Sequence, residues 1–368
     1  MKKTKKAIRL MIPGPVEVHP DVLEAMAAPI EPHYGNAWVE KHSRLTSLLK
    51  RVYKTENDVF LLAGSGTCAL DACMGSSLRT GDKIIVGNNG FFGDRLVEIA
   101  DLNGLEVIQV KTEWGRKITP EMMESALGIH TDARAAAVVH SETSTTVLNP
   151  IDEIGKVFMG RDVLYIVDAV SALGGLPYEV DEWGIDLCAS ASQKCLGAPP
   201  GLATVSVSPK AWDFIETSGN RAHGWFTNLK VWKKYRDEWG DWHPTPVTMP
   251  VSLANALLVS LTQLMEEGIP SRMARFREMA LTLRQGLREA GMEPFTPDDE
   301  LNPVLTAAFS PEGRESGEIV QYLLEEHNIQ ISGGLGSLRP VIFRIGHMSP
   351  VLTMEDIETL VTALKKFK

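Results

Sequence analysis

Cys188-Ala-Ser-Ala-Ser-Gln-Lys-Cys-Leu-Gly-Ala-Pro-Pro-Gly201 is the stretch that decides the expected architecture of this 368-residue chain. A short run of apolar and small residues, typical of a buried strand, ends at Lys194 and passes directly into a turn rich in Gly and Pro. A lysine at the end of a buried strand is unfavourable to desolvate unless a partner stabilises its charge. Lysine is also the side chain that forms Schiff bases with carbonyl compounds.

The expected partner of Lys194 lies earlier in the chain, in Tyr165-Ile-Val-Asp-Ala-Val-Ser171. Here an apolar strand ends in a single carboxylate, Asp168. One interpretation of the two charges is a structural salt bridge. The other is a site for pyridoxal phosphate, in which an aspartate pairs with the pyridine nitrogen and a lysine holds the aldehyde.

Apolar runs of strand length alternate with helical patterns from about residue 58 to residue 208. The predicted strands are Val59–Ala63, Lys83–Val86, Val107–Val110, Ala135–His140, Leu164–Asp168, Leu187–Ala191 and Ala203–Ser208. Several are continuously apolar, which suits a mostly parallel sheet with helices on both faces. The predicted helices between them include Thr67–Leu78, Arg95–Asn103 and Thr119–Leu127.

The pattern changes near residue 250, where two long amphipathic helices are followed by short strands and two more helices. In the last helix, Thr353 is the expected N-cap, with Asp356 three residues later. The sequence therefore predicts an N-terminal segment (1–15), a large α/β domain (16–250) and a smaller C-terminal α+β domain (251–368).

The turn after the first predicted strand, Leu62-Ala-Gly-Ser-Gly-Thr-Cys-Ala69, is a candidate phosphate site. It opens a helix, so free N–H groups and the hydroxyls of Ser65 and Thr67 are suited to an anion. The spacing Gly64-x-Gly66-x-x-Ala69 also satisfies a relaxed dinucleotide fingerprint. That alternative needs a carboxylate at the end of the next strand, and the sequence there has none.

Three further residues are candidates for binding a cofactor or a substrate. Phe92 lies in a Gly-rich loop after the second predicted strand, where a ring can stack on a planar group. Thr143 follows the fourth strand and carries a hydroxyl. Arg344 lies inside an apolar strand, and a buried guanidinium needs an anion, which a carboxylate satisfies bidentately. Each residue taken alone also suits core packing, turn chemistry or a salt bridge.

Together these motifs resemble the class V branch of the fold-type I pyridoxal phosphate aminotransferases. The similar segments run almost from end to end and include Pro13-Gly-Pro15, Gly64-Ser-Gly-Thr67, Gly93-Asp-Arg95, His140-Ser-Glu-Thr-Ser-Thr145, Val167-Asp-Ala-Val-Ser171, Ser192–Gly201 and Arg344-Ile-Gly-His347. The nearest members are the alanine–glyoxylate and serine–glyoxylate (serine–pyruvate) aminotransferases. The resemblance implies ping-pong transfer of an amino group from a small amino acid of the alanine or serine type to glyoxylate or pyruvate.

The resemblance also implies a role for each matching residue. Lys194 would bind the cofactor aldehyde and move protons, and Asp168 would keep the pyridine nitrogen protonated. Phe92 would stack on the ring, and Thr143 would hydrogen-bond its phenolic oxygen. The phosphate would be held by Ser65, Gly66, Thr67 and Gln193.

Two more implied roles concern the substrate and a second subunit. Arg344 would bind the substrate carboxylate. Thr245, in Trp242-His-Pro-Thr-Pro246, matches a segment that reaches into the partner's site, so a homodimer with shared sites is expected.

Some departures from the family pattern leave the amino donor open. The chain has Thr67 where the glyoxylate enzymes often have His, Phe92 where they often have Trp, and Trp242 in place of an expected Tyr. Cys195-Leu-Gly is more similar to pyridoxamine–pyruvate aminotransferase, which stays an alternative. A lyase or desulfurase on the same fold is another, but residues 315–340 offer no mobile cysteine for it.

The composition argues against several classes of binding partner. A net charge of -10 argues against a general nucleic-acid or membrane-surface role, and no run of eighteen apolar residues predicts a membrane span. The four cysteines form no CxxC pair, so neither a disulfide framework nor a metal site is expected. With no recognisable signal peptide, a cytoplasmic location is the expectation.

Overall fold

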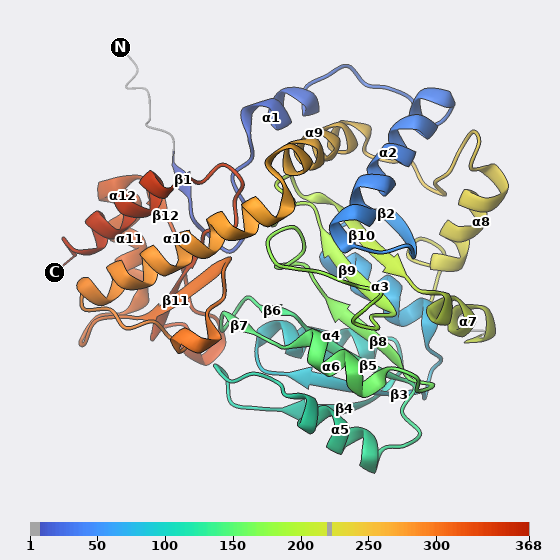
Figure 1. Ribbon diagram of the computed structural model, residues 1–368, viewed down its shortest axis with the longest axis horizontal. Helices are drawn as coiled ribbons and strands as arrows, with labels where there is room; N and C mark the ends of the chain where they lie inside the picture. The colour runs from blue at the N-terminus through green and yellow to red at the C-terminus, as the bar shows by residue number, and fades with distance from the viewer. Residues whose placement is uncertain (1–7, 219–222, 368) are drawn as a thin grey trace.

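The computed structural model describes residues 8–218 and 223–367, so residues 1–7 of the expected N-terminal segment lie outside it. Figure 1 shows a central sheet flanked by helices and, beside it, a smaller group of elements from the C-terminal part of the chain. The central sheet has seven strands in the order β2-β10-β9-β8-β5-β3-β4. All seven predicted strands are confirmed as β2 (Asp58–Gly64), β3 (Lys83–Asn88), β4 (Glu106–Lys111), β5 (Ala135–Val139), β8 (Leu164–Asp168), β9 (Leu187–Ala191) and β10 (Gly201–Val207).

The sheet is parallel except for β10, which pairs antiparallel with both β2 and β9. Since β10 reverses direction, the other six strands all point the same way and end at one edge. The sheet is covered by α3 (Gly66–Ser77), α4 (Phe91–Leu102), α5 (Pro120–Ile129), α6 (Ile151–Phe158), α7 (Pro209–Ser218) and α8 (Leu229–Trp239). The fold is therefore the predicted α/β architecture with a large, mostly parallel sheet.

Helix α4 differs from its prediction. It begins at Phe91, whereas the pattern predicts a helix only from Arg95. Thus Phe92 lies in the first turn of a helix and not in a loop. The reason is tertiary: the Glu142 carboxylate accepts the N–H groups of Phe92 and Gly93 at 3.1 and 3.0 Å and so caps the helix from a distant segment.

The smaller C-terminal part is built on an antiparallel sheet in the order β11-β14-β13. Its elements are α10 (Ile269–Glu289), β11 (Leu305–Phe309), α11 (Ser316–His327), β13 (Ser332–Gly333), β14 (Ile342–Gly346) and α12 (Met354–Leu364). The predicted cap of α12 is confirmed, because Thr353 and Asp356 form a capping box. In addition, β1 (Arg9–Leu10) pairs parallel with β12 (Ile329–Gln330), which joins the N-terminal segment to this part.

Three helices lie on the side of the large sheet that faces the N-terminal segment. The sequence pattern does not predict α1 (Pro20–Met26) or α2 (Asn36–Tyr53), whose N-cap residue, Gly35, provides no side-chain cap. Both pack against α9 (Val251–Glu267), as Figure 1 also shows. Helix α9 follows the expected domain boundary at residue 250 but packs against α1 and α2, which precede that boundary. The boundary therefore stays a prediction.

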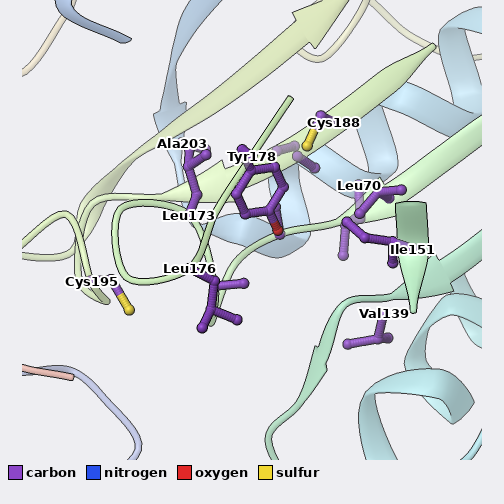
Figure 2. Packing of buried hydrophobic residues seen from close by; sticks show 14 of the residues in the cluster. Leu70, Val139, Ile151, Leu173, Leu176, Tyr178, Cys188, Cys195 and Ala203 are labelled. Atoms are coloured by element: carbon purple, nitrogen blue, oxygen red, sulfur yellow. The ribbon is translucent and has the colours of Figure 1, made fainter. Parts of the chain in front are cut away.

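Apolar side chains from both faces of the large sheet form a continuous core. Figure 2 shows part of it, where Leu173, Leu176 and Tyr178 from the β8–β9 connection lie in one cluster with Leu70 of α3. Tyr178 is anchored by a 2.6 Å hydrogen bond between its hydroxyl and His140 Nδ1. Within the described residues, no helix has the length and apolar character needed to cross a membrane.

Truncation of Leu173 to Ala is expected to destabilise the protein by about 2–5 kcal/mol, because it leaves a cavity in this core. The matched control is Leu102→Ala at the end of α4, whose side chain is 86% exposed and whose loss should change stability by at most about 0.5 kcal/mol. Urea unfolding of both variants at one protein concentration measures the difference. Equal losses in the two variants would show that the β8–β9 connection is not part of the core.

Candidate active site

A cavity of about 390 Å³ lies where β2, β5, β8 and β9 end. Ligands of open α/β sheets bind at this edge, because the connections after parallel strands leave a crevice there. The predicted site residues that line it are Ser65, Gly66, Thr67, Phe92, Thr143, Asp168, Gln193 and Lys194. The tertiary structure thus brings these eight together from segments that are far apart in the sequence.

Lys194 stands in a tight turn directly after β9. Gly197 N–H donates to the Lys194 carbonyl at 2.8 Å, and Ala198 N–H donates to the Ser192 carbonyl at 3.0 Å. The lysine is 9% exposed, and its Nζ donates to the carbonyl oxygen of Pro13. Burial lowers the pKa of the amine to about 8, an effect that nearby Cys195 and Asp168 oppose. The amine is therefore largely neutral slightly above physiological pH, as a base or nucleophile requires.

Asp168 ends β8 beside the same cavity. Its Oδ1 accepts a 2.8 Å hydrogen bond from Val170 N–H, and its Oδ2 has no donor among the described residues. Burial raises the pKa of this carboxyl to about 6, while the Val170 hydrogen bond and the charges of Lys194 and Arg95 lower it. Asp168 and Lys194 are not within salt-bridge distance in the described part of the chain, so the structural salt bridge is not formed.

The predicted phosphate turn is the N-terminus of α3. Ser65 is the N-cap residue, but its side chain makes no capping hydrogen bond, so the hydroxyl and the first N–H groups of the helix are available to an anion. Gly66 has to be glycine, because a Cβ there would lie 2.4 Å from Val170 Cγ2. Across the cavity, the side-chain oxygen of Gln193 is buried without a partner in the described residues.

Phe92 is held by a charged neighbour whose role the sequence analysis missed. Arg95, one turn later on α4, places its guanidinium 5.0 Å from the Phe92 ring centre and 5.2 Å from that of Phe91. Arg95 also lines the cavity and forms no ion pair with another described residue. Residues three apart lie on the same face of a helix, so the spacing of Phe92 and Arg95 indicates a contact only when α4 is known to begin at Phe91.

Glu142 is the second residue to which the sequence analysis gave no role. Its carboxylate binds backbone N–H groups of α4 and of Ser144. It is completely buried, which raises the pKa of its carboxyl. Besides capping α4 it accepts the N–H and Oγ–H of Ser144, at 2.9 and 2.5 Å. It therefore joins the hairpin of β6 (Ser141–Glu142) and β7 (Val147–Leu148) to the helix that carries Phe92.

Arg344 lies next to the cavity rather than in its lining. Its Nη1 donates to the Thr143 carbonyl at 3.0 Å and its Nε to the Gly333 carbonyl at 2.9 Å. Burial lowers the pKa of the guanidinium to about 10, an effect that the charge of Glu142 opposes, and no carboxylate of the described residues forms an ion pair with it. Its remaining donors can thus bind an anion from outside the chain. The Thr143 hydroxyl bonds Ser171 Oγ at 2.7 Å and lines the cavity.

Thr245 is the one predicted site residue that the structure does not bring near the cavity of its own chain. It is fully buried, and its hydroxyl has no partner among the described residues. The neighbouring Trp242 is 51% exposed. The role expected for Thr245 lies in a partner's site, and it stays a prediction.

These groups fit pyridoxal phosphate. The free helix start with Ser65 suits a phosphate, and the unpaired oxygen of Asp168 suits a protonated ring nitrogen. Phe92 offers a ring face, and Lys194 offers an amine whose pKa is lowered to about 8. The cavity therefore has a matching group for each part of this cofactor.

Comparison with known proteins agrees with this geometry. Residues 10–358 match the family model described as aminotransferase class-V. An uncharacterized aminotransferase of Methanocaldococcus jannaschii is 41% identical over 95% of this chain and 90% of its own. The alanine–glyoxylate aminotransferase of Rattus norvegicus is 33% identical over 97% of this chain and 86% of its own.

A solved structure supports the same assignment. The alanine–glyoxylate aminotransferase of Nostoc sp. superposes with a TM-score of 0.93 at 31% identity and covers 100% of this chain and 96% of its own. The family resemblance and the cofactor predicted from the sequence are confirmed. The chain belongs to the class V aminotransferases, and it is a pyridoxal phosphate-dependent transaminase of fold type I.

Proposed function

We propose that the protein transfers the amino group of a small amino acid, of the alanine or serine type, to glyoxylate or pyruvate. The relatives from rat and Nostoc named above are alanine–glyoxylate aminotransferases, which supports this choice. The single observation that carries the proposal is Arg344, a buried guanidinium without a carboxylate partner in the described residues, held against Thr143 at the edge of the cavity. An amino acid and a 2-oxo acid share the carboxylate that this group recognises.

The chain's own residues supply binding and proton transfer. When bound, pyridoxal phosphate supplies an aldehyde that takes up the amino group and a ring that withdraws electrons from the Cα–H bond. Arg344 binds the substrate carboxylate and so orients the Cα–H bond. Lys194 Nζ accepts the Cα proton as a general base, and Asp168 stabilises positive charge on the ring nitrogen. Because one Arg344 serves both substrates, they bind in turn, which gives a ping-pong order.

The desulfurase alternative requires a reactive, accessible cysteine. Three of the four thiols, Cys73, Cys188 and Cys195, are buried, and Cys68 is half-buried. Burial raises the pKa of Cys195 to about 12 and that of Cys68 to about 11. Thiols of this kind are poor nucleophiles at neutral pH, so transamination is the better proposal. Four unpaired cysteines also agree with the proposed cytoplasmic location.

A half-reaction panel tests the substrate. The purified enzyme is mixed with single amino acids and with free pyridoxamine, and the loss of its visible absorbance is followed. We expect conversion by alanine or serine, no conversion by large or charged amino acids, and none in Lys194→Ala. Rapid conversion by free pyridoxamine alone would move the protein to the pyridoxamine–pyruvate branch.

The reaction of Lys194 with pyridoxal phosphate should report its lowered pKa. Burial disfavours the ammonium form, so the reactive neutral amine becomes dominant at lower pH than in an ordinary lysine. We expect the rate constant for cofactor capture by cofactor-free protein to rise with pH toward about 8 and then level off. Stopped-flow absorbance between pH 7 and 10 measures it, with Lys194→Ala as the blank. A rate that keeps rising to pH 10 would contradict a lowered pKa.

We further propose a homodimer with shared active sites. The support is a cluster of rings on one surface of the single chain, which we call the aromatic surface. It is formed by His33, Tyr34, Trp225, Tyr235, Trp239, Trp242 and His243, whose neighbouring ring centres lie 5.2 to 6.4 Å apart. Four of these rings are at least 46% exposed, an unusual density of apolar area for a free surface. The segment that carries Thr245 follows directly.

Complementation between two inactive variants tests the sharing. One variant is Lys194→Ala, and the other is Trp242→Ala combined with Thr245→Ala. If residues 242 and 245 complete the partner's site, each mixed dimer has one intact site, and a 1:1 mixture recovers about a quarter of wild-type activity. Sedimentation verifies the dimer. No recovery from chains that exchange freely would show that these residues act within their own subunit.

A further inference from the structure

The N-terminal segment from Met11 to Val16 runs between the two parts of the molecule, and we call it the N-terminal strap. At its start it is fastened to the small sheet. Met11 N–H donates to the Gln330 carbonyl at 2.8 Å, and the Met11 carbonyl accepts Gly346 N–H at 2.8 Å. Gly346 is the last residue of β14, the strand that carries Arg344.

The other end of the strap is fastened to the turn that carries the lysine. The Val16 N–H donates to the Gln193 carbonyl at 3.0 Å, and the Pro13 carbonyl accepts Lys194 Nζ. This carbonyl is the hydrogen-bond acceptor that the described residues offer to the amine. Because it belongs to the backbone and the strap is bonded at both ends, its position is set by the fold.

Two glycines show how closely the strap is packed. Gly14 has φ +107°, and a Cβ there would lie 2.6 Å from Lys194 Cδ and 2.7 Å from Nζ. At the opposite contact, a Cβ on Gly346 would lie 2.1 Å from the Ile12 carbonyl oxygen. The strap thus touches the lysine side chain on one side and the backbone of the arginine strand on the other, and neither contact has room for a methyl group.

We propose that the N-terminal strap is a positioning element for transamination, which holds the Lys194 amine through the Pro13 carbonyl and fixes its place relative to Arg344. This rests on the roles proposed above for these two residues. A lysine side chain has several rotatable bonds and loses much freedom when its end is held. The fixed carbonyl selects one direction for an N–H and thereby directs the nitrogen lone pair. Since the same strap is also hydrogen-bonded to β14, it fixes the position of Lys194, the base, relative to Arg344, the carboxylate-binding group.

Substitution of Gly14 by Ala tests the contact with the lysine. The added methyl meets a flexible side chain, so the expected response is displacement of Lys194 from Pro13 rather than unfolding. We expect cofactor capture to slow by about tenfold or more, kcat to fall similarly with KM little changed, and the pH midpoint of the holoenzyme's visible absorbance to shift. The matched control is Gly81→Ala, with φ +87° and no atom within 4 Å of the added Cβ; it carries a similar backbone strain but should capture the cofactor and turn over as wild type does.

Substitution of Gly346 by Ala tests the coupling from the other end. The methyl meets the Ile12 backbone and does not contact the lysine, yet capture by Lys194 should slow, and KM for the amino acid should rise. Wild-type capture in Gly14→Ala would overturn the positioning role, and wild-type capture in Gly346→Ala would overturn the coupling. Cofactor capture uses no amino acid. An incorrect substrate assignment would therefore change the result of the half-reaction panel but not the capture rates of these variants.

Discussion

The burial of Lys194 is the constraint on which the active site depends. Burial lowers the pKa of its amine to about 8 and raises that of the Asp168 carboxyl to about 6. Both shifts arise from the same loss of hydration, which disfavours whichever form is charged. An amine and a carboxyl that burial shifts toward their neutral forms, with no ion pair between them, are a poor structural pair. They are a good arrangement for a cofactor that bonds to the first group and places a cationic nitrogen against the second.

Close packing of backbone against side chains keeps these groups buried. Gly66 brings the start of α3 against Val170, Gly90 lets the Glu142 carboxylate approach α4, and Gly14 lies across Lys194. In each case a Cβ would fall 2.4 to 2.6 Å from a neighbouring atom. The glycines therefore allow the backbone to approach where a Cβ has no room. Arg344 adds a second buried charge, held by two carbonyl oxygens and available to a substrate carboxylate.

The sequence predicted the strands and eight of the residues that line the cavity, because apolar runs that end in polar residues follow from local chemistry. It placed Phe92 in a loop and did not assign Arg95 or Glu142, for one shared reason. The start of α4 depends on a carboxylate that is 50 residues away in the chain. No local pattern records that contact, and without it the spacing of Phe92 and Arg95 on one helix face is not visible. The start of α2 has no local signal either, because its N-cap residue, Gly35, provides no side-chain cap.

By itself the sequence determined the order of the strands along the chain, the residue types at their ends and the chemistry that those residues can perform together. Lys194, Asp168, the candidate phosphate turn, Phe92 and Arg344 indicate the cofactor when they are taken together. Only the tertiary structure decided that β10 runs antiparallel, that Arg344 finds no carboxylate partner in the described chain, and that the Pro13 carbonyl meets the lysine amine. These depend on contacts between distant segments. Their energies come from burial and hydrogen-bond geometry in the assembled fold, which a linear pattern of residues does not contain.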